Sequence, residues 1–295
     1  MPQGSKLCPS CGRLNGVGEA RCFHCNKRLP GPVLAAVLDV YRSLFGGELA
    51  MTRILIGMNV VVFGLCVALD QRIPVVSDLM PSLDPNRFHA STLIRMGALA
   101  ARDVFFPYLP PLELEPSRYL SAMFVHSSVL HLVFNMLALS SFGGALERQL
   151  GSARYAVLFL VTGILGFVIS DYWNRPLPVY TLGASGGAFG LLGARIGVLY
   201  ARRDPGWKDE LIRNAVLAGI LALAMRVNTA AHLGGAAVGV VLGLLFEKEP
   251  RRGRLTPLFA IIALVGLLSS VGSIILSNHS PLWRQARVFE MNVYQ

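Results

Sequence analysis

Seven long apolar runs constrain this chain more than any other feature of its sequence. Each approaches the length that a helix needs to cross a bilayer, about 20 residues. Because backbone polar groups in lipid must find partners within their own segment, every run is predicted to form a helix. The composition agrees, since 53% of the 295 residues are hydrophobic and only 15% are charged. The predicted spans are 54–69, 124–146, 155–169, 182–200, 211–225, 230–246 and 255–276.

The runs predict an all-α membrane protein, a polytopic helical bundle that carries a small N-terminal module. Segment 71–118 contains prolines, aromatics and charges of both signs, with no apolar run long enough to span. We expect it to lie on the membrane surface as short helices and loops. The predicted parts are a zinc-ribbon-like module (1–29), a linker with an interfacial helix (30–52), the transmembrane domain (53–277) and a C-terminal tail (278–295).

The net charge of +10 comes mostly from basic residues that lie beside the apolar runs. In that position they fix the topology of the spans, so the expected partner is the lipid bilayer and nucleic acid is excluded. Every second connection is basic, whereas the connections between them hold only Arg175 and Arg226. This asymmetry predicts a cytosolic N-terminus and an external C-terminal tail. The basic connections hold Arg148, Arg154, Arg202, Arg203, Lys208, Arg213, Lys248, Arg251, Arg252 and Arg254.

Four of the five cysteines form two C-x-x-C pairs near the N-terminus, Cys8 with Cys11 and Cys22 with Cys25. Four thiolates at this spacing suit tetrahedral zinc, and so small a module needs such a link because it has almost no core. A disulfide pair is disfavoured in the reducing cytosol, and a redox motif is disfavoured because no βαβ pattern surrounds it. We expect structural zinc and a cytosolic partner or signal for the module, with a merely structural tag as the alternative.

Two polar residues lie at the beginning of glycine-rich apolar runs. Ser185 lies in Gly183-Ala184-Ser185-Gly186, and His232 lies in Ala231-His232-Leu233-Gly234-Gly235. Glycines at three- and four-residue spacing permit close helix contact, so the serine and the histidine are predicted to meet as a nucleophile and its base. Generic helix packing is the alternative reading of the glycines.

Three further polar residues, His126, His131 and Asn135, lie along the outer half of the second predicted span. With the predicted topology they share one level with Ser185 and His232. Strongly polar groups at membrane depth indicate function, whereas a lone histidine would more often be structural. A transporter or channel with a proton path is disfavoured, because the two halves show no repeat and the spans hold no chain of carboxylates.

These motifs, in this order, resemble the rhomboid family of intramembrane serine proteases. The resemblance covers roughly residues 115–248 and comprises H-x-x-x-x-H-x-x-x-N, G-x-S-G and A-H-x-x-G-x-x-x-G. It implies a six-helix core to which the seventh span is added. It also implies that Ser185 is the nucleophile and His232 the base of a catalytic dyad, with no cofactor. His131, Asn135 and the Ser185 backbone N–H would form the oxyanion hole.

The resemblance also implies that transmembrane protein substrates are cut near the outer face of the bilayer. Segment 113–118 resembles the end of the family's first outer loop, and 143–148 the turn after its second helix. Ser117 stands where the family usually has an aromatic residue, and Phe189 where it often has tyrosine. An inactive rhomboid-like protein that binds membrane clients is the alternative function. The expected location is a bacterial cytoplasmic (inner) membrane, with the active site toward the outer face.

Overall fold

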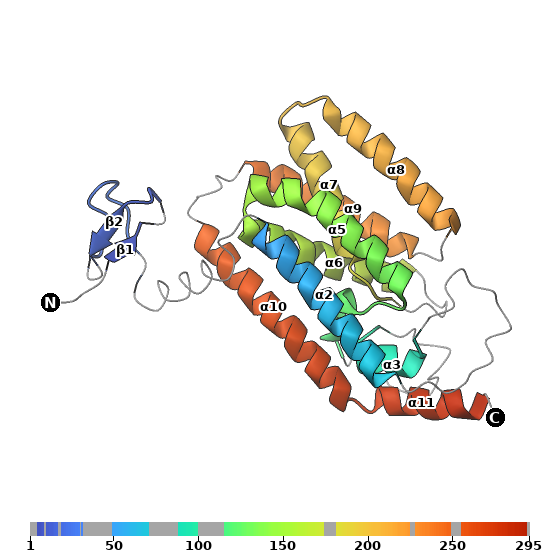
Figure 1. Cartoon of the computed structure of the whole chain (residues 1–295). Coiled ribbons are helices and arrows are strands. Elements are labelled where there is room, and N and C mark those ends of the chain that lie inside the picture. Colours follow the sequence, from blue (N-terminus) through green and yellow to red (C-terminus); the bar gives the residue numbers. More distant parts are fainter. Residues whose placement is uncertain are drawn as a thin grey trace.

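The computed structural model describes residues 5–8, 10–16, 19–29, 31, 49–70, 88–99, 115–173, 181–224, 228–248 and 255–293. Seven helices account for most of them and lie side by side as a bundle (Figure 1). The bundle is therefore all-α, as predicted. Nearly all of the predicted linker and interfacial helix lies outside the described residues. The bundle helices are α2 (Ala50–Leu69), α5 (Val129–Leu150), α6 (Ser152–Trp173), α7 (Ser185–Ala201), α8 (Gly206–Ala224), α9 (Thr229–Glu247) and α10 (Thr256–His279).

Five of these helices, α2, α5, α6, α9 and α10, are long and apolar enough to cross a membrane, counted over the residues that the structure describes. Helix α7 has only 17 residues, and α8 carries Lys208, Asp209 and Glu210 in its first turns. Both nevertheless occur where the sequence predicts a span. A bundle of apolar helices with large exposed hydrophobic side chains on its outside identifies a membrane protein.

Helix α5 begins at Val129, five residues later than the predicted span. Residues Ala122–Phe124 form a 3-10 turn, η2, and Val125 is extended. Ser128 then caps α5, because its side chain accepts a hydrogen bond from the His131 backbone N–H. His126 consequently lies ahead of the helix and not along it, which corrects the prediction. Segment 143–148, expected as a turn, forms the last turns of α5.

The described part of segment 71–118 folds around one buried cation, Arg118. This residue begins the short helix α4 (Arg118–Ser121), and its side chain is fully buried. The guanidinium donates to the carbonyl oxygens of Ile94 and Ala98, at 2.7 and 3.2 Å, and pairs with Glu115. Ile94 belongs to α3 (Ala90–Arg95), so Arg118 fixes both the end of α3 and the chain that follows it.

That fixed chain supports the segment leading into α7. Leu99 and Thr181 exchange two backbone hydrogen bonds of 3.1 and 3.0 Å as an isolated antiparallel bridge. The Gly183 N–H donates to the Ala122 carbonyl oxygen at 2.8 Å. The start of α7 is thus held by residues that precede it by some 60 to 80 positions.

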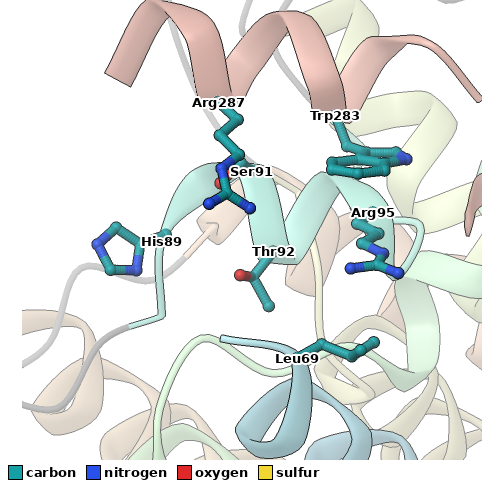
Figure 2. Close-up of a pocket in the computed structure, with 7 residues that line it drawn as sticks. All are labelled: Leu69, His89, Ser91, Thr92, Arg95, Trp283 and Arg287. Atoms are coloured by element: carbon teal, nitrogen blue, oxygen red, sulfur yellow. The ribbon is translucent and has the colours of Figure 1, made fainter. Parts of the chain in front are cut away.

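The region described above as a C-terminal tail contains a helix, α11 (Leu282–Val293), which packs against α3. The Ser91 backbone N–H donates to Glu290 at 3.2 Å, and the Trp283 indole N–H donates to the Asn278 carbonyl oxygen at 3.0 Å. Figure 2 shows a pocket where α11 and α3 meet the end of α2 at Leu69; the side chain of Arg287 extends into it from α11, above Thr92 of α3. The sequence signal for α11 is its amphipathic pattern after Pro281, which the length of the apolar runs does not reveal.

The N-terminal module has its own small core. Strands β1 (Ser5–Leu7) and β2 (Leu14–Gly16) form an antiparallel hairpin in which Leu7 lies opposite Leu14. Cys8, Cys22 and Leu29 are buried together. So small an apolar cluster would contribute little to folding by itself.

Candidate active site

Ser185 and His232 meet at one end of the bundle. Ser185 is the first residue of α7, and His232 lies in the first turn of α9. The Ser185 Oγ lies 2.8 Å from the His232 Nε2, which is hydrogen-bond distance. The sequence predicts this meeting, and the two residues are 47 positions apart. A serine hydroxyl bonded to an imidazole nitrogen has the geometry of a nucleophile beside a general base.

Direct backbone contact between α7 and α9 brings these two residues together. If Gly235, Gly239 or Gly243 of α9 carried a Cβ, that atom would lie 2.0–2.3 Å from a carbonyl oxygen of α7. The same holds in reverse for Gly193 and Gly197 of α7, at 2.1 and 2.3 Å from carbonyl oxygens of α9. Real Cβ atoms do not approach so closely, so these five positions, the glycine seam, admit only glycine.

The ring of Phe189 lies flat against the His232 imidazole. The ring centroids are 4.3 Å apart and the planes differ by 6°. Phe189 is one helical turn after Ser185 on α7, so the same helix carries the hydroxyl and the surface that holds the imidazole. The sequence has no Asp or Glu in the first turns of α7 or α9 that would orient the imidazole as in a catalytic triad. The stacked Phe189 ring instead restricts the plane of the imidazole.

His131 and Asn135 come from the first turns of α5 and lie beside Gly183. A Cβ at Gly183 would lie 2.7 Å from the His131 Nε2 and 3.8 Å from the Asn135 Nδ2. Gly183 also has a φ of +104°, which other residues rarely adopt. Two polar side chains therefore face the backbone that leads into Ser185. One amide N–H of Asn135 donates to the His131 carbonyl oxygen at 2.8 Å, which leaves its second N–H for another acceptor.

His126 contacts both the backbone before Ser185 and the ring of His131. It is fully buried, its Nε2 accepts a 3.4 Å hydrogen bond from the Ala184 backbone N–H, and its ring lies edge-on to that of His131 with centroids 4.9 Å apart. The His131 Nδ1 lies 3.2 Å from the Ser127 Oγ. The structure thus brings all five predicted polar residues to one end of the bundle. The His126 side chain contacts the backbone of the serine loop, residues 181–185, at Ala184.

Sequence reasoning missed a further polar residue at this end, Asn228. Its side chain lies between Ser170 of α6, Thr181 before α7 and the first turn of α9. An asparagine immediately before a helix is a capping signal, and its position four residues before His232 could have drawn attention to it.

The four cysteines of the module cluster as a candidate metal centre. Their sulfur atoms all lie within 4.8 Å of one another, with Cys8 and Cys25 at 3.6 Å and Cys11 and Cys22 at 3.5 Å. Sulfurs bound tetrahedrally at about 2.3 Å from zinc would be about 3.8 Å apart, so the cluster fits a metal ion of that kind. Burial raises the pKa of Cys22, but backbone N–H donors from Cys25 and His24 outweigh it and lower the pKa to about 6.

Comparison with known proteins agrees with these motifs. The family model described as "Rhomboid domain" matches residues 113–249. RHOMBOID-like protein 2 of Arabidopsis thaliana is 36% identical over 172 residues, which are 56% of this chain and 51% of that protein. The Bacillus subtilis protein named "Putative rhomboid protease YdcA" is 33% identical over 146 residues, 46% of this chain and 70% of that protein. The chain spans about half the length of the Arabidopsis relatives it matches.

The relatives do not support one expectation from the sequence, the bacterial cytoplasmic membrane. They come from a plant, a fungus and a bacterium, and one from Arabidopsis, 30% identical over 179 residues (59% of this chain, 54% of that protein), is named RHOMBOID-like protein 6, mitochondrial. For this chain, the structure shows a membrane protein with several apolar helices.

Proposed function

Because the chain belongs to the rhomboid family, we propose that it is an intramembrane serine protease that cleaves transmembrane helices with a Ser185–His232 dyad. The observation that carries this proposal is the 2.8 Å contact between the Ser185 Oγ and the His232 Nε2. The same contact favours a protease over an inactive protein that binds membrane clients, since client binding would not require a hydroxyl paired with an imidazole.

In the first step the Ser185 Oγ attacks the carbonyl carbon of the scissile peptide bond while its proton passes to the His232 Nε2. The resulting tetrahedral intermediate collapses as the imidazolium gives that proton to the leaving amine. A water molecule then loses a proton to His232 and attacks the acyl-enzyme, and Ser185 recovers its hydroxyl hydrogen. The dyad therefore returns to its starting state, and one peptide bond and one water become an acid and an amine.

His131, Asn135 and the Ser185 backbone N–H are the donors that we assign to the oxyanion. Both side chains lie beside Gly183, two residues before the nucleophile. The negative charge appears on the carbonyl oxygen only as Ser185 attacks, so donors fixed at that place lower the barrier without binding the substrate more tightly.

The substrate is a transmembrane helix that is locally unwound where it is cut. A regular helix keeps its carbonyl groups in internal hydrogen bonds, so a segment weakened by glycine or proline is the one that can reach Ser185. Ser185 and His232 lie in the first turns of their helices, at the end of the bundle opposite Arg148, Arg154 and Arg202. The positive-inside rule assigns that end to the outer face.

We expect a model single-span substrate to be cut near its outer end, at a small residue beside glycine or proline. Mass spectrometry of both fragments in liposomes of known orientation locates the cut. As a matched control, a substrate with leucines in place of the glycine or proline should be cut at least about tenfold more slowly, because its helix does not unwind. Cleavage at the cytosolic end would contradict the assigned topology.

The cysteine cluster is proposed to hold one structural zinc ion on the cytosolic side, where the module docks a protein partner or senses a cytosolic condition. Metal analysis of the purified chain should give about one zinc per molecule. Replacing Cys8 and Cys11 together by serine should remove the metal and unfold the hairpin. Replacing Cys66, which is buried in α2, by alanine is the control and should leave the metal content unchanged. A chain free of metal would contradict the zinc assignment.

A further inference from the structure

One side-chain amide joins the two elements that carry the dyad. The Asn228 Oδ1 accepts hydrogen bonds from the Ala231 backbone N–H at 3.1 Å and from the Ser170 hydroxyl at 2.8 Å. The Asn228 Nδ2 donates to the Thr181 Oγ1 at 3.0 Å. Three polar groups from three separate parts of the chain thus converge on one amide.

On one side, Asn228 fixes the beginning of α9. Its side chain caps the helix through Ala231, and its backbone carbonyl accepts from the His232 N–H at 3.2 Å. The first turn of α9, which carries His232, is therefore anchored at Asn228 by two bonds.

On the other side, Asn228 holds the chain that leads into Ser185. Thr181 is buried, pairs with Leu99 through its backbone, and lies four residues before the nucleophile. Ser170 of α6 provides a third attachment. The Asn228 amide is therefore bonded to α6 as well as to the start of α9 and to Thr181.

We propose that Asn228 is a positioning residue that sets the distance between Ser185 and His232. The inference rests on the proposed protease function and adds a component that neither the motifs nor the family match assigns. A dyad without an orienting carboxylate needs its two members held in place by other contacts. Phe189 fixes the plane of the imidazole, and Asn228 fixes the helix start from which the imidazole extends relative to the serine loop.

The decisive variants break the Asn228–Thr181 bond from either end. Thr181→Val removes the acceptor hydroxyl at nearly constant volume. Asn228→Ser still caps α9, because serine is a good N-cap, but it is too short to reach Thr181. Since a shift of about 1 Å in a catalytic group can cost roughly 100-fold in rate, we expect each variant to lower kcat about 10- to 100-fold. KM should change less than about threefold, because substrate binding does not use this bond.

Two further variants distinguish a positioning role from a general loss of stability: the double variant and Asn228→Asp. The double variant should be no slower than the slower single variant, because both changes remove the same bond. Asn228→Asp should keep kcat within about fivefold of the parent, since aspartate is an equally good cap and the Thr181 hydroxyl can donate to it. Thr52→Val is the matched control. It removes a buried threonine hydroxyl that donates to Glu147 at 2.7 Å at the other end of the bundle, and it should lower Tm without lowering kcat.

The experiment first measures cleavage of a model substrate by the parent chain, and absence of cleavage there would overturn the proposed function itself. With an active parent, kcat, KM and Tm are measured for every variant, together with the rate at which a fluorophosphonate probe labels Ser185. Lower kcat and slower labelling at unchanged Tm would support the proposal. Parent-like kcat in Thr181→Val and Asn228→Ser, or kcat losses that multiply in the double variant, would overturn it.

Discussion

Ser185→Ala and His232→Ala are each expected to abolish cleavage of a transmembrane substrate by the purified chain. In the proposed mechanism, alanine at 185 removes the atom that attacks the peptide, and alanine at 232 removes the acceptor for its proton, 2.8 Å away. Because the two act as a unit, either loss should reduce kcat on the order of 10⁶-fold, as in soluble serine proteases, and the double variant should be no worse. Gel-based cleavage of a single-span substrate in detergent measures the effect.

The control for this pair is thermal unfolding of the same preparations. Both variants should keep the parent's Tm within a few degrees, since neither substitution touches the glycine seam. Cleavage by a purified Ser185→Ala variant at the parent's rate would rule out Ser185 as the nucleophile.

The second large effect is expected at His131 and Asn135, the proposed oxyanion donors. His131→Ala and Asn135→Ala should each lower kcat by about 10²- to 10³-fold, or roughly 2.7–4 kcal/mol of transition-state stabilisation, if the value for a soluble protease applies. KM should remain nearly constant, because the charge that these groups stabilise is absent from the bound substrate. Steady-state kinetics with a soluble fluorogenic peptide or a reconstituted substrate separates the two constants.

Asn59 provides a matched control for Asn135. Both asparagines are buried in apolar helices, and each donates from Nδ2 to the carbonyl oxygen four residues earlier, at 2.6 and 2.8 Å. Asn59→Ala should therefore carry a similar structural cost while leaving kcat unchanged. If Asn135→Ala altered only KM, or if both alanine variants lowered kcat equally, Asn135 would not be an oxyanion donor.

Much of the fold was predictable because the membrane imposes a simple rule. A run of about 20 apolar residues must be a helix, and the described helices coincide with the seven runs to within about five residues. The exact starts were less predictable, because they depend on caps. Ser128 shifts the start of α5 past His126, and no hydropathy pattern marks that shift. Helix α11 was missed because a short amphipathic helix has no long apolar run.

The candidate site was predictable where polar residues interrupt apolar sequence. Ser185, His232, His131 and Asn135 are conspicuous for that reason, and the glycine spacing indicated that the first two would meet. Asn228 and Thr181 lie in short polar connections, where a polar residue is ordinary. The contribution proposed for them depends on a hydrogen bond between residues 47 positions apart, which only the folded chain reveals.

Because of the glycine seam, we expect α7 and α9 to move together as a rigid pair of helices. Their backbones touch at three glycines of α9 spaced four residues apart, which leaves no room for a third segment between them. The transmembrane substrate that we propose would therefore have to approach Ser185 from another side. Complete separation of the serine from the histidine would require the two backbones to part along their length, whereas the shift expected on loss of the Asn228–Thr181 bond is only about 1 Å. Heating should accordingly leave the hydroxyl and the imidazole paired until that whole contact opens at once.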